Sequence, residues 1–284
     1  MINIPGSSHP IDQILKALSW LFGILILGYF FYLTLNIVSH GFSGLSWGFL
    51  FELPENAGRQ GGIAPMLVST VIMLILCLLI SLPIGIGSAI FLSEYTQENQ
   101  IFTRIIRESL IVIASIPSIV MGLFGYAFFV VKLNLGFSLL SGALTLTCMV
   151  LPLLIRTIEE SLRSIPSSHR LNAQALGLPK WRIIFELLLP MASQGILLAI
   201  ILSIGRAMAE TAALLYTSGY VMRMPESIMD SGRSLSVHIF DLSMNVPGGE
   251  QAAYSSALIL IMLLFGINSI TLVLNRIITK RSVS

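Results

Sequence analysis

Six long apolar stretches divide this 284-residue sequence, and they constrain the fold more than any other feature. An α-helix needs roughly 20 predominantly apolar residues to cross the hydrocarbon core of a bilayer. Each stretch is close to that length or longer, and only the fifth contains charged residues. The sequence therefore predicts an all-α, polytopic membrane protein with about six transmembrane helices. The predicted spans are Leu18–Val38, Ala64–Phe91, Leu110–Val131, Leu139–Ile155, Leu187–Thr217 and Ala253–Leu274.

The composition excludes a soluble catalytic domain. Charged residues make up 11% of the chain and hydrophobic residues 55%, whereas soluble domains carry roughly 25% charged residues. Cys77 and Cys148 lie inside apolar stretches, and no two of the four histidines have metal-ligand spacing. We therefore expect buried thiols and no metal site. We also expect no cofactor, no catalytic residue and no nucleic-acid partner.

The positive charges lie unevenly between the predicted spans. If the N-terminus is cytoplasmic, the cytoplasmic segments hold eleven Lys and Arg residues and the external segments hold four, with Arg206 left inside the fifth span. Cytoplasmic loops are the ones enriched in Lys and Arg. We therefore expect both termini inside, external loops near residues 39–63 and 218–252, and a long cytoplasmic segment over Thr157–Glu186.

Proline and glycine interrupt the second and third spans. Pro83 is followed by two closely spaced glycines, and Pro117 is followed by Gly122 and Gly125. A proline inside a helix removes one hydrogen bond and kinks the axis, and the freed carbonyl needs protein or water as a partner. We predict helix kinks at Pro83 and Pro117. Two interpretations stay open: these residues line a pathway, or the small residues let helices pack closely.

The segment between the fourth and fifth spans is longer than a turn between neighbouring helices requires. Ser167 or Ser168 can cap a short helix that runs to Leu176. Gly177 supplies a left-handed turn at its end, and Pro179 is suited to open the next helix. The helix mixes apolar and polar residues, which suits either docking into the groove of a partner or lying on the lipid surface.

This segment resembles the EAA loop of ABC-importer permeases, whose pattern is Glu-Ala-Ala, three residues, Gly, nine residues and then Ile-x-Leu-Pro. Residues 171–173 align with Glu-Ala-Ala, Gly177 with the glycine, and residues 187–190 with the final motif. Leu171 stands where the family usually has glutamate. Leu171 cannot form the ion pair that a glutamate at this position would make with the ATPase, but docking of the helix does not depend on that pair. The resemblance implies coupling to an ATPase through Leu171, Asn172, Ala173, Gly177 and Pro179.

Further stretches narrow the resemblance to the permeases of phosphate importers, over roughly residues 64–275. It implies the type I ABC-importer permease fold, with residues 1–63 as an N-terminal region holding the first span and the first external loop, 64–275 as the permease domain and 276–284 as a short cytoplasmic tail. The matching stretches are 93–95, 105–107, 115–124, 151–159, 175–181 and 205–212.

The same resemblance implies a function and a set of partners. The chain would be the transmembrane permease subunit of an ATP-driven phosphate importer in the bacterial cell membrane, and it would form half of the pathway. Its partners would be a second related permease, two ATPase subunits and an extracytoplasmic phosphate-binding protein. The sequence contains no G-x-x-x-x-G-K-[ST] motif, so ATP must bind to another subunit and this chain is not itself an enzyme.

Three charged residues are candidates for the substrate pathway. Arg206 and Glu210 lie four apart in the fifth span, on one face of a continuous helix, and charges at membrane depth are functional by default. Arg suits phosphate because it presents a charged, planar set of donors. Our hypothesis is that Glu210 holds Arg206 in one state and yields it to phosphate in another; the alternative is a structural ion pair. Arg156 is a candidate through the resemblance, although Glu159 and Glu160 are close enough to pair with it.

Two other functions stay open from the sequence. An intramembrane transferase would need a cluster of acids, histidines or metal ligands, and Glu210 has only an arginine beside it. The permease architecture could also carry another cargo, such as phosphonate, another oxyanion or an amino acid. The intramembrane arginine favours an anion, and only the resemblance makes that anion phosphate.

Overall fold

The computed structural model describes residues 10–97 and 100–283, with side chains placed for 12–97 and 100–273. Within this part, four helices are long and apolar enough to cross a membrane, and two bent helix pairs bring the number of candidate spans to as many as six. The prediction of an all-α protein with about six spans is confirmed. The four long helices are α1 (Pro10–Phe42), α3 (Ala64–Ile90), α6 (Leu139–Arg163) and α13 (Glu250–Val283).

The third predicted span is broken rather than kinked. α4 (Ile101–Ser115) and α5 (Ser118–Gly125), which continues as a π-helix over Tyr126–Lys132, meet at an angle of 100°. Ile116 between them is extended, with ψ of 130°, because the ring of a following proline disfavours helical backbone. The predicted kink at Pro117 is therefore a helix end.

The fifth predicted span is also broken. A short helical stretch over Lys180–Met191, formed by α8 (Lys180–Arg182), a π-helix (Ile183–Leu188) and α9 (Leu189–Met191), meets α10 (Ser193–Ala209) at 67°. α10 ends well before Thr217, and a separate turn, α11 (Ala212–Leu215), follows it. The prediction of one continuous helix over residues 187–217 is wrong.

Small residues in these helices allow close packing. α3 runs without a break through Pro83, whose side chain is exposed. A methyl group placed at Gly85 would overlap Leu154 of α6, and one placed at Gly122 of α5 would lie 2.8 Å from the Cα atom of Ala213 in α11. Gly85 and Gly122 therefore act at helix–helix contacts, as small residues do in membrane proteins, whereas Gly87 faces open space.

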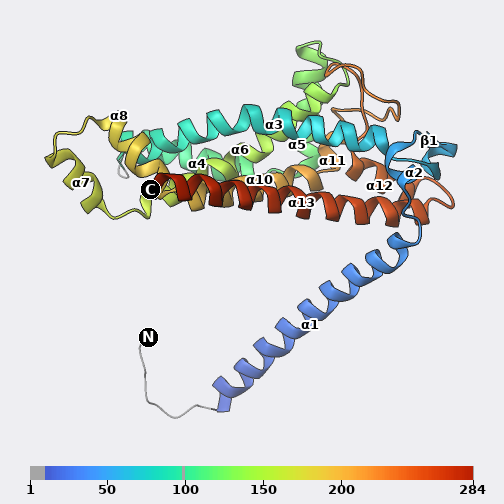
Figure 1. Ribbon diagram of the computed structural model, residues 1–284, viewed down its shortest axis with the longest axis horizontal. Coiled ribbons are helices and arrows are strands. Elements are labelled where there is room, and N and C mark those ends of the chain that lie inside the picture. Colours follow the sequence, from blue (N-terminus) through green and yellow to red (C-terminus); the bar gives the residue numbers. More distant parts are fainter. Residues whose placement is uncertain (1–9, 98–99, 284) are drawn as a thin grey trace.

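The core is built around α3 and α6. One buried cluster joins these helices to residues 173–199, and a second joins them to α10 and α12 (Leu235–Met244). At the end of the body opposite α7 (Ser167–Ala175) lie α12, the five-residue helix α2 (Trp47–Phe51) and a two-stranded hairpin (Figure 1). The hairpin pairs β1 (Pro54–Glu55) with β2 (Gln60–Gly61) in antiparallel register, around a 3-10 turn over Asn56–Gly58.

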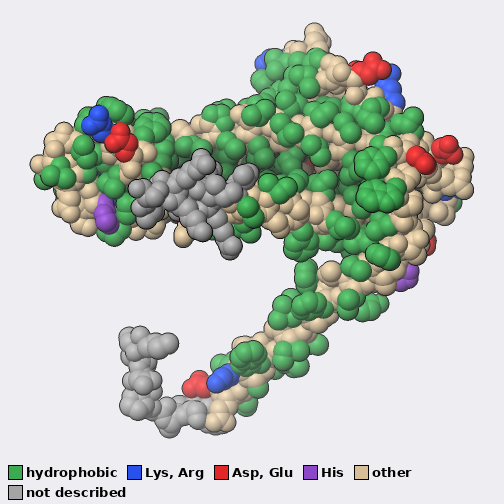
Figure 2. All heavy atoms as spheres, in the orientation of Figure 1, with side chains coloured by type: hydrophobic (Ala, Val, Ile, Leu, Met, Phe, Trp, Pro, Cys, Tyr) green, Lys and Arg blue, Asp and Glu red, His purple; other side chains and the backbone are tan. Residues whose placement is uncertain are grey.

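The first helix projects away from this body (Figure 1). The most apolar window of α1 has no buried residue. Its C-terminal end contacts the start of α13, where the Ser255 hydroxyl donates to the Gly41 carbonyl at 3.0 Å and the His40 ring stacks on Tyr254 at 5.1 Å. Figure 2 shows hydrophobic side chains along α1 and along the visible face of the body, with charged side chains gathered near the ends.

The last helix continues beyond its membrane-spanning part. α13 is helical to Val283, whereas the candidate span within it covers Glu250–Val273. Residues 1–9 and Ser284 lie outside the described part of the chain.

Candidate functional site

The segment that links α6 to α10 forms the short helix predicted from its sequence. α7 ends in two hydrogen bonds of a left-handed C-terminal turn, from Gly177 N–H to the Gln174 carbonyl at 2.9 Å and from Leu178 N–H to the Ala173 carbonyl at 3.1 Å. Gly177 has φ of +76°, where residues with a Cβ atom are strained. The start differs from the prediction, because Pro166 is the N-cap and neither predicted serine caps the helix through its side chain.

One side of α7 packs against the body of the protein, and the other side is exposed. Ala173 is buried against Leu162, Ile165 and Ile183. By contrast, Leu171 is 62% exposed and Leu176 is 81% exposed. Asn172 and Pro179 are exposed as well. The exposed side of this segment thus combines two apolar side chains, Leu171 and Leu176, with polar ones such as Asn172, a mixture that suits docking into a groove on another protein.

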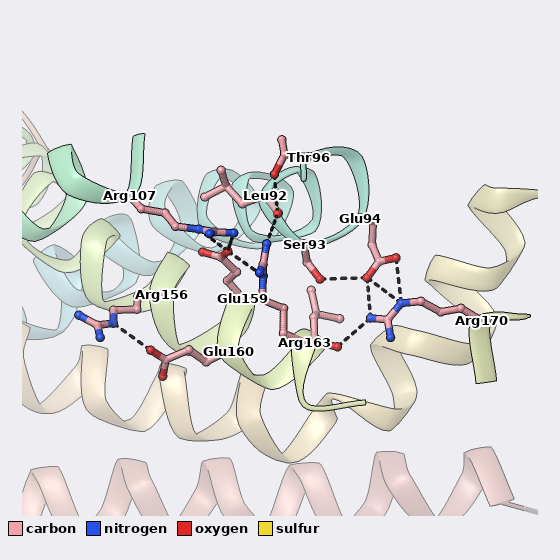
Figure 3. A network of polar contacts seen from close by, with 11 residues as sticks. Leu92, Ser93, Glu94, Thr96, Arg107, Arg156, Glu159, Glu160, Arg163 and Arg170 are labelled. Atoms are coloured by element: carbon pink, nitrogen blue, oxygen red, sulfur yellow. Dashed lines mark hydrogen bonds and ion pairs between the residues drawn. The ribbon is translucent and has the colours of Figure 1, made fainter. Parts of the chain in front are cut away.

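A carboxylate from another part of the chain holds the inner side of α7. Glu94 lies in the π-helical turn Phe91–Tyr95 that ends α3, and it accepts two hydrogen bonds from Arg170 Nε and one from Arg170 Nη2, the shortest at 2.7 Å (Figure 3). The side chain of Glu94 is 8% exposed and that of Arg170 is 20% exposed. The geometry is a bidentate, charge-assisted pair, which is stronger than an ordinary hydrogen bond.

A second buried carboxylate, that of Glu159, lies near the Glu94–Arg170 pair (Figure 3). Glu159 of α6 pairs with Arg107 of α4 at 2.7 Å and with Arg163 of α6 at 3.0 Å. Arg163 also donates to the carbonyl of Leu92 at 3.0 Å. A buried carboxylate needs such compensation, because removing it from water costs several kcal/mol. The Glu159 cluster therefore fixes α4, α6 and the end of α3 to one another.

Arg156 lies at the edge of a cleft beside this cluster. The cleft has a volume of about 380 Å³. Arg156 makes an ion pair with Glu160 at 2.9 Å, and both side chains are more than 60% exposed. The structure thus brings Arg156 together with two other arginines, whereas Arg206 and Glu210 do not line this cleft. The lining residues are Arg107, Leu110, Ile111, Ala114, Pro152, Leu153, Arg156, Glu159, Glu160 and Arg163.

Arg206 and Glu210 do not lie in one continuous helix, so that part of the prediction is wrong. α10 ends at Ala209, and Glu210 is extended with ψ of 125°. Its carboxylate accepts from the Ser118 hydroxyl at 3.1 Å and from the Ala213 backbone N–H at 3.2 Å. Glu210 therefore joins the two helix breaks, one before α5 and one before α11.

Arg206 remains accessible on α10. Its side chain is exposed, on the same strip of the helix as Leu202 and Leu198. Among the residues that the structure describes, Arg206 makes no hydrogen bond or ion pair. An accessible cation on an otherwise apolar helix strip can bind an anion without first breaking an internal bond.

A third polar cluster lies at the opposite end of the body, outside the candidate spans. Arg233 pairs with Asp241 at 2.8 Å and lies over the Tyr220 ring at 4.6 Å. His238 is fully buried beside them. The pKa of His238 is lowered from 6.5 to about 4, mainly by burial and then by the positive charge of Arg233, while Asp241 partly opposes the shift.

This histidine makes folding depend on pH. The unfolded chain binds a proton at His238 near pH 6.5 while the folded chain does not until about pH 4, so stability is lost as pH falls through that window. We expect the thermal unfolding midpoint to drop between pH 7 and pH 5, and the drop to shrink in His238→Asn. The matched control is His169→Asn, on the exposed side of α7. Equal slopes in His238→Asn and the parent protein would contradict the assignment.

Several of these residues carry no local signal in the sequence. Glu94 and Arg170 are 76 positions apart, and Arg107 and Glu159 are 52 apart. In the sequence, the run Ser93-Glu94-Tyr95 indicates only a family resemblance, and Arg170 is one polar residue among several in the short helix. A pairing of this kind would be visible from sequence only through covariation between the two positions.

Comparison with known proteins shows which family and which relatives this chain resembles. The family described as "Binding-protein-dependent transport system inner membrane component" matches residues 81–283. A probable ABC transporter permease protein, YqgI of Bacillus subtilis, is 31% identical over 84% of each chain. The phosphate transport system permease protein PstA of Yersinia pestis is 36% identical over 73% of this chain and 69% of its own length.

A solved structure supports the fold. A chain of a bacterial ABC transporter for import of the acidic polysaccharide alginate superimposes with a TM-score of 0.66, over 94% of this chain and 96% of that one. The sequence identity is 16%, so this likeness concerns the fold alone.

Proposed function

This chain belongs to the family of binding-protein-dependent transport system inner membrane components, and from that premise we propose that it carries phosphate. It is a multi-pass membrane protein with the fold of ABC-importer permeases. The observation that carries the cargo proposal is its identity of 36% to a phosphate transport system permease. In this proposal the chain forms half of a pathway for phosphate, and ATP is hydrolysed by partner subunits.

Arg206 is the proposed contact for phosphate in the pathway. Its guanidinium is accessible on α10, and within the described residues it has no internal partner to give up. Arg presents several fixed donors to a phosphate and keeps its charge at every working pH. A pathway site must also release its ligand, and an exposed arginine at the edge of one subunit meets that need better than an enclosed one.

Arg156 is a second proposed contact. It shares its cleft with Arg107 and Arg163, and its own pairing with Glu160 is exposed and therefore weak. Phosphate could displace Glu160 from Arg156 at small cost. The Glu159 cluster stays intact in this scheme, because its arginines are held by a buried carboxylate.

The proposed partners cover surfaces that this chain leaves exposed. A second, related permease would cover the strip of α10 that carries Arg206. Two ATPase subunits would bind on the α7 side of the complex, which the distribution of Lys and Arg predicts to be cytoplasmic. A phosphate-binding protein would deliver its ligand at the end that carries α2 and α12. Closure of the ATPases on ATP would then displace α7 and switch the pathway between outward and inward access.

Labelled phosphate uptake tests this proposal. The chain is co-expressed with its presumed partner subunits and placed in vesicles, and uptake is measured with and without ATP. We expect ATP-dependent uptake that excess unlabelled phosphate suppresses and methylphosphonate suppresses weakly. Uptake or ATPase stimulation by another oxyanion, with no response to phosphate, would keep the architecture and overturn the cargo.

A further inference from the structure

The Glu94–Arg170 pair joins three parts of the chain at one guanidinium. Arg170 belongs to α7, and Glu94 belongs to the turn at the end of α3. The same guanidinium donates from Nη2 to the Leu162 carbonyl at 2.8 Å and from Nη1 to the Ile165 carbonyl at 2.9 Å, at the end of α6 and just beyond it. Figure 3 shows Arg170 reaching across from α7 toward Glu94.

A lysine makes a second link from the far side of the α7 turn. Lys180 Nζ donates to the backbone carbonyl of Glu94 at 2.6 Å and lies 4.0 Å from the centre of the Tyr95 ring. Residues 94–95 therefore receive a positive side chain from before Gly177 and another from after it. The segment from Arg170 to Lys180 is held at both ends on the last turn of α3.

The pair is placed where it can transmit a force. Apart from these polar contacts, the described residues of α7 are fixed to the body mainly by the small side chain of Ala173. A displacement of α7 that passed only through the flanking loops would be absorbed by backbone rotation. Through Arg170 and Glu94 it reaches α3 directly, and α3 packs along α6 in the core.

We propose that Glu94 is a positioning residue that links α7 to α3, so that movement of α7 is converted into movement of the membrane helices. The inference rests on the proposed function, because it assumes that partner ATPases act on α7. Glu94 contacts neither ATP nor the transported anion in this scheme. Its carboxylate keeps Arg170 and the end of α3 at a fixed separation while the complex cycles.

Paired measurements of transport and hydrolysis test the link. Glu94→Gln keeps the size of the side chain and removes its charge. We expect phosphate uptake per ATP hydrolysed to fall about fivefold or more, in line with typical coupling between sites. The matched control is Glu186→Gln, which removes an exposed pair with Arg182 in the same region at 3.4 Å. This control should keep the parent ratio, and the charge exchange Glu94→Arg with Arg170→Glu should restore much of it.

A purely structural role predicts a different result. Loss of stability would lower the amount of assembled complex, so uptake and hydrolysis would fall together and their ratio would not change. That outcome for Glu94→Gln would overturn the proposal. Absence of phosphate uptake in the parent complex would instead overturn the proposed cargo.

A distance measurement tests the link independently of cargo. Spin labels are attached at Ser168 on α7 and Leu79 on α3, both exposed, in a protein whose Cys77 and Cys148 are alanine. In the assembled complex, we expect addition of ATP to leave this distance unchanged with Glu94 present and to change it in Glu94→Gln. An unchanged distance in both proteins, with the ATPase subunits shown to close, would overturn the proposal.

Discussion

Replacing Arg206 with alanine should lower ATP-dependent phosphate uptake by about tenfold to a hundredfold while the complex still assembles. The size of the effect follows from losing a hydrogen-bonded contact to a charged group, about 1.5–3 kcal/mol. Assembly should survive because Arg206 is exposed and makes no ion pair within the described residues. Arg206→Lys should retain part of the activity, since lysine keeps the charge and loses the planar set of donors.

The measurement is labelled phosphate uptake per assembled complex in vesicles, with basal ATP hydrolysis recorded in parallel. Arg223→Ala serves as the control, because Arg223 is an arginine outside the candidate spans and is 72% exposed. It should transport at the parent rate. If both Arg206 variants also transported at that rate, Arg206 would have no part in the pathway.

Replacing Gly177 with valine should uncouple hydrolysis from uptake, with a loss of uptake of about tenfold. A methyl group at Gly177 would meet no atom within 4 Å, so crowding is not the cause. The cause is the backbone, because φ of +76° is strained for a residue with a branched Cβ by about 1–2 kcal/mol. Relief of that strain would turn the end of α7 and redirect Leu178, whose N–H closes the helix.

Asparagine at the same position separates conformation from bulk. Asn tolerates the left-handed region far better than valine does, so Gly177→Asn should keep most of the uptake although its side chain is of similar size. The two variants are compared for uptake per ATP hydrolysed in assembled complexes. Equal losses of uptake in both variants would show that the partner recognises the surface around Gly177 rather than its backbone conformation.

The sequence predicted local features well and tertiary ones poorly. The turn at Gly177 was predictable because a glycine that ends a helix acts through its own φ angle. The apolar length of the spans was equally local. The angle at Pro117 was not predictable, because it depends on how α5 packs against α11, where Gly122 meets Ala213.

The early end of α10 has a similar explanation. Residues 206–210, Arg-Ala-Met-Ala-Glu, are good helix formers, so sequence alone extends the helix through Glu210. A tertiary bond from Ser118 and a local bond from Ala213 N–H hold the Glu210 carboxylate at the start of α11, and they outweigh a helix preference worth only tenths of a kcal/mol per residue. The short helix and its turn at Gly177 form as the sequence predicts, whereas the helix that carries Arg206 ends before Glu210.

The contact between α1 and α13 has a consequence for how the chain is made. α1 is synthesised before α13, yet these helices contact each other through Gly41 and Ser255, 214 positions apart. α1 therefore enters the membrane before its neighbour α13 has been made. A chain that is cut before Glu250 lacks these contacts of α1 with α13, and incompletely folded chains of this kind are prone to misassembly.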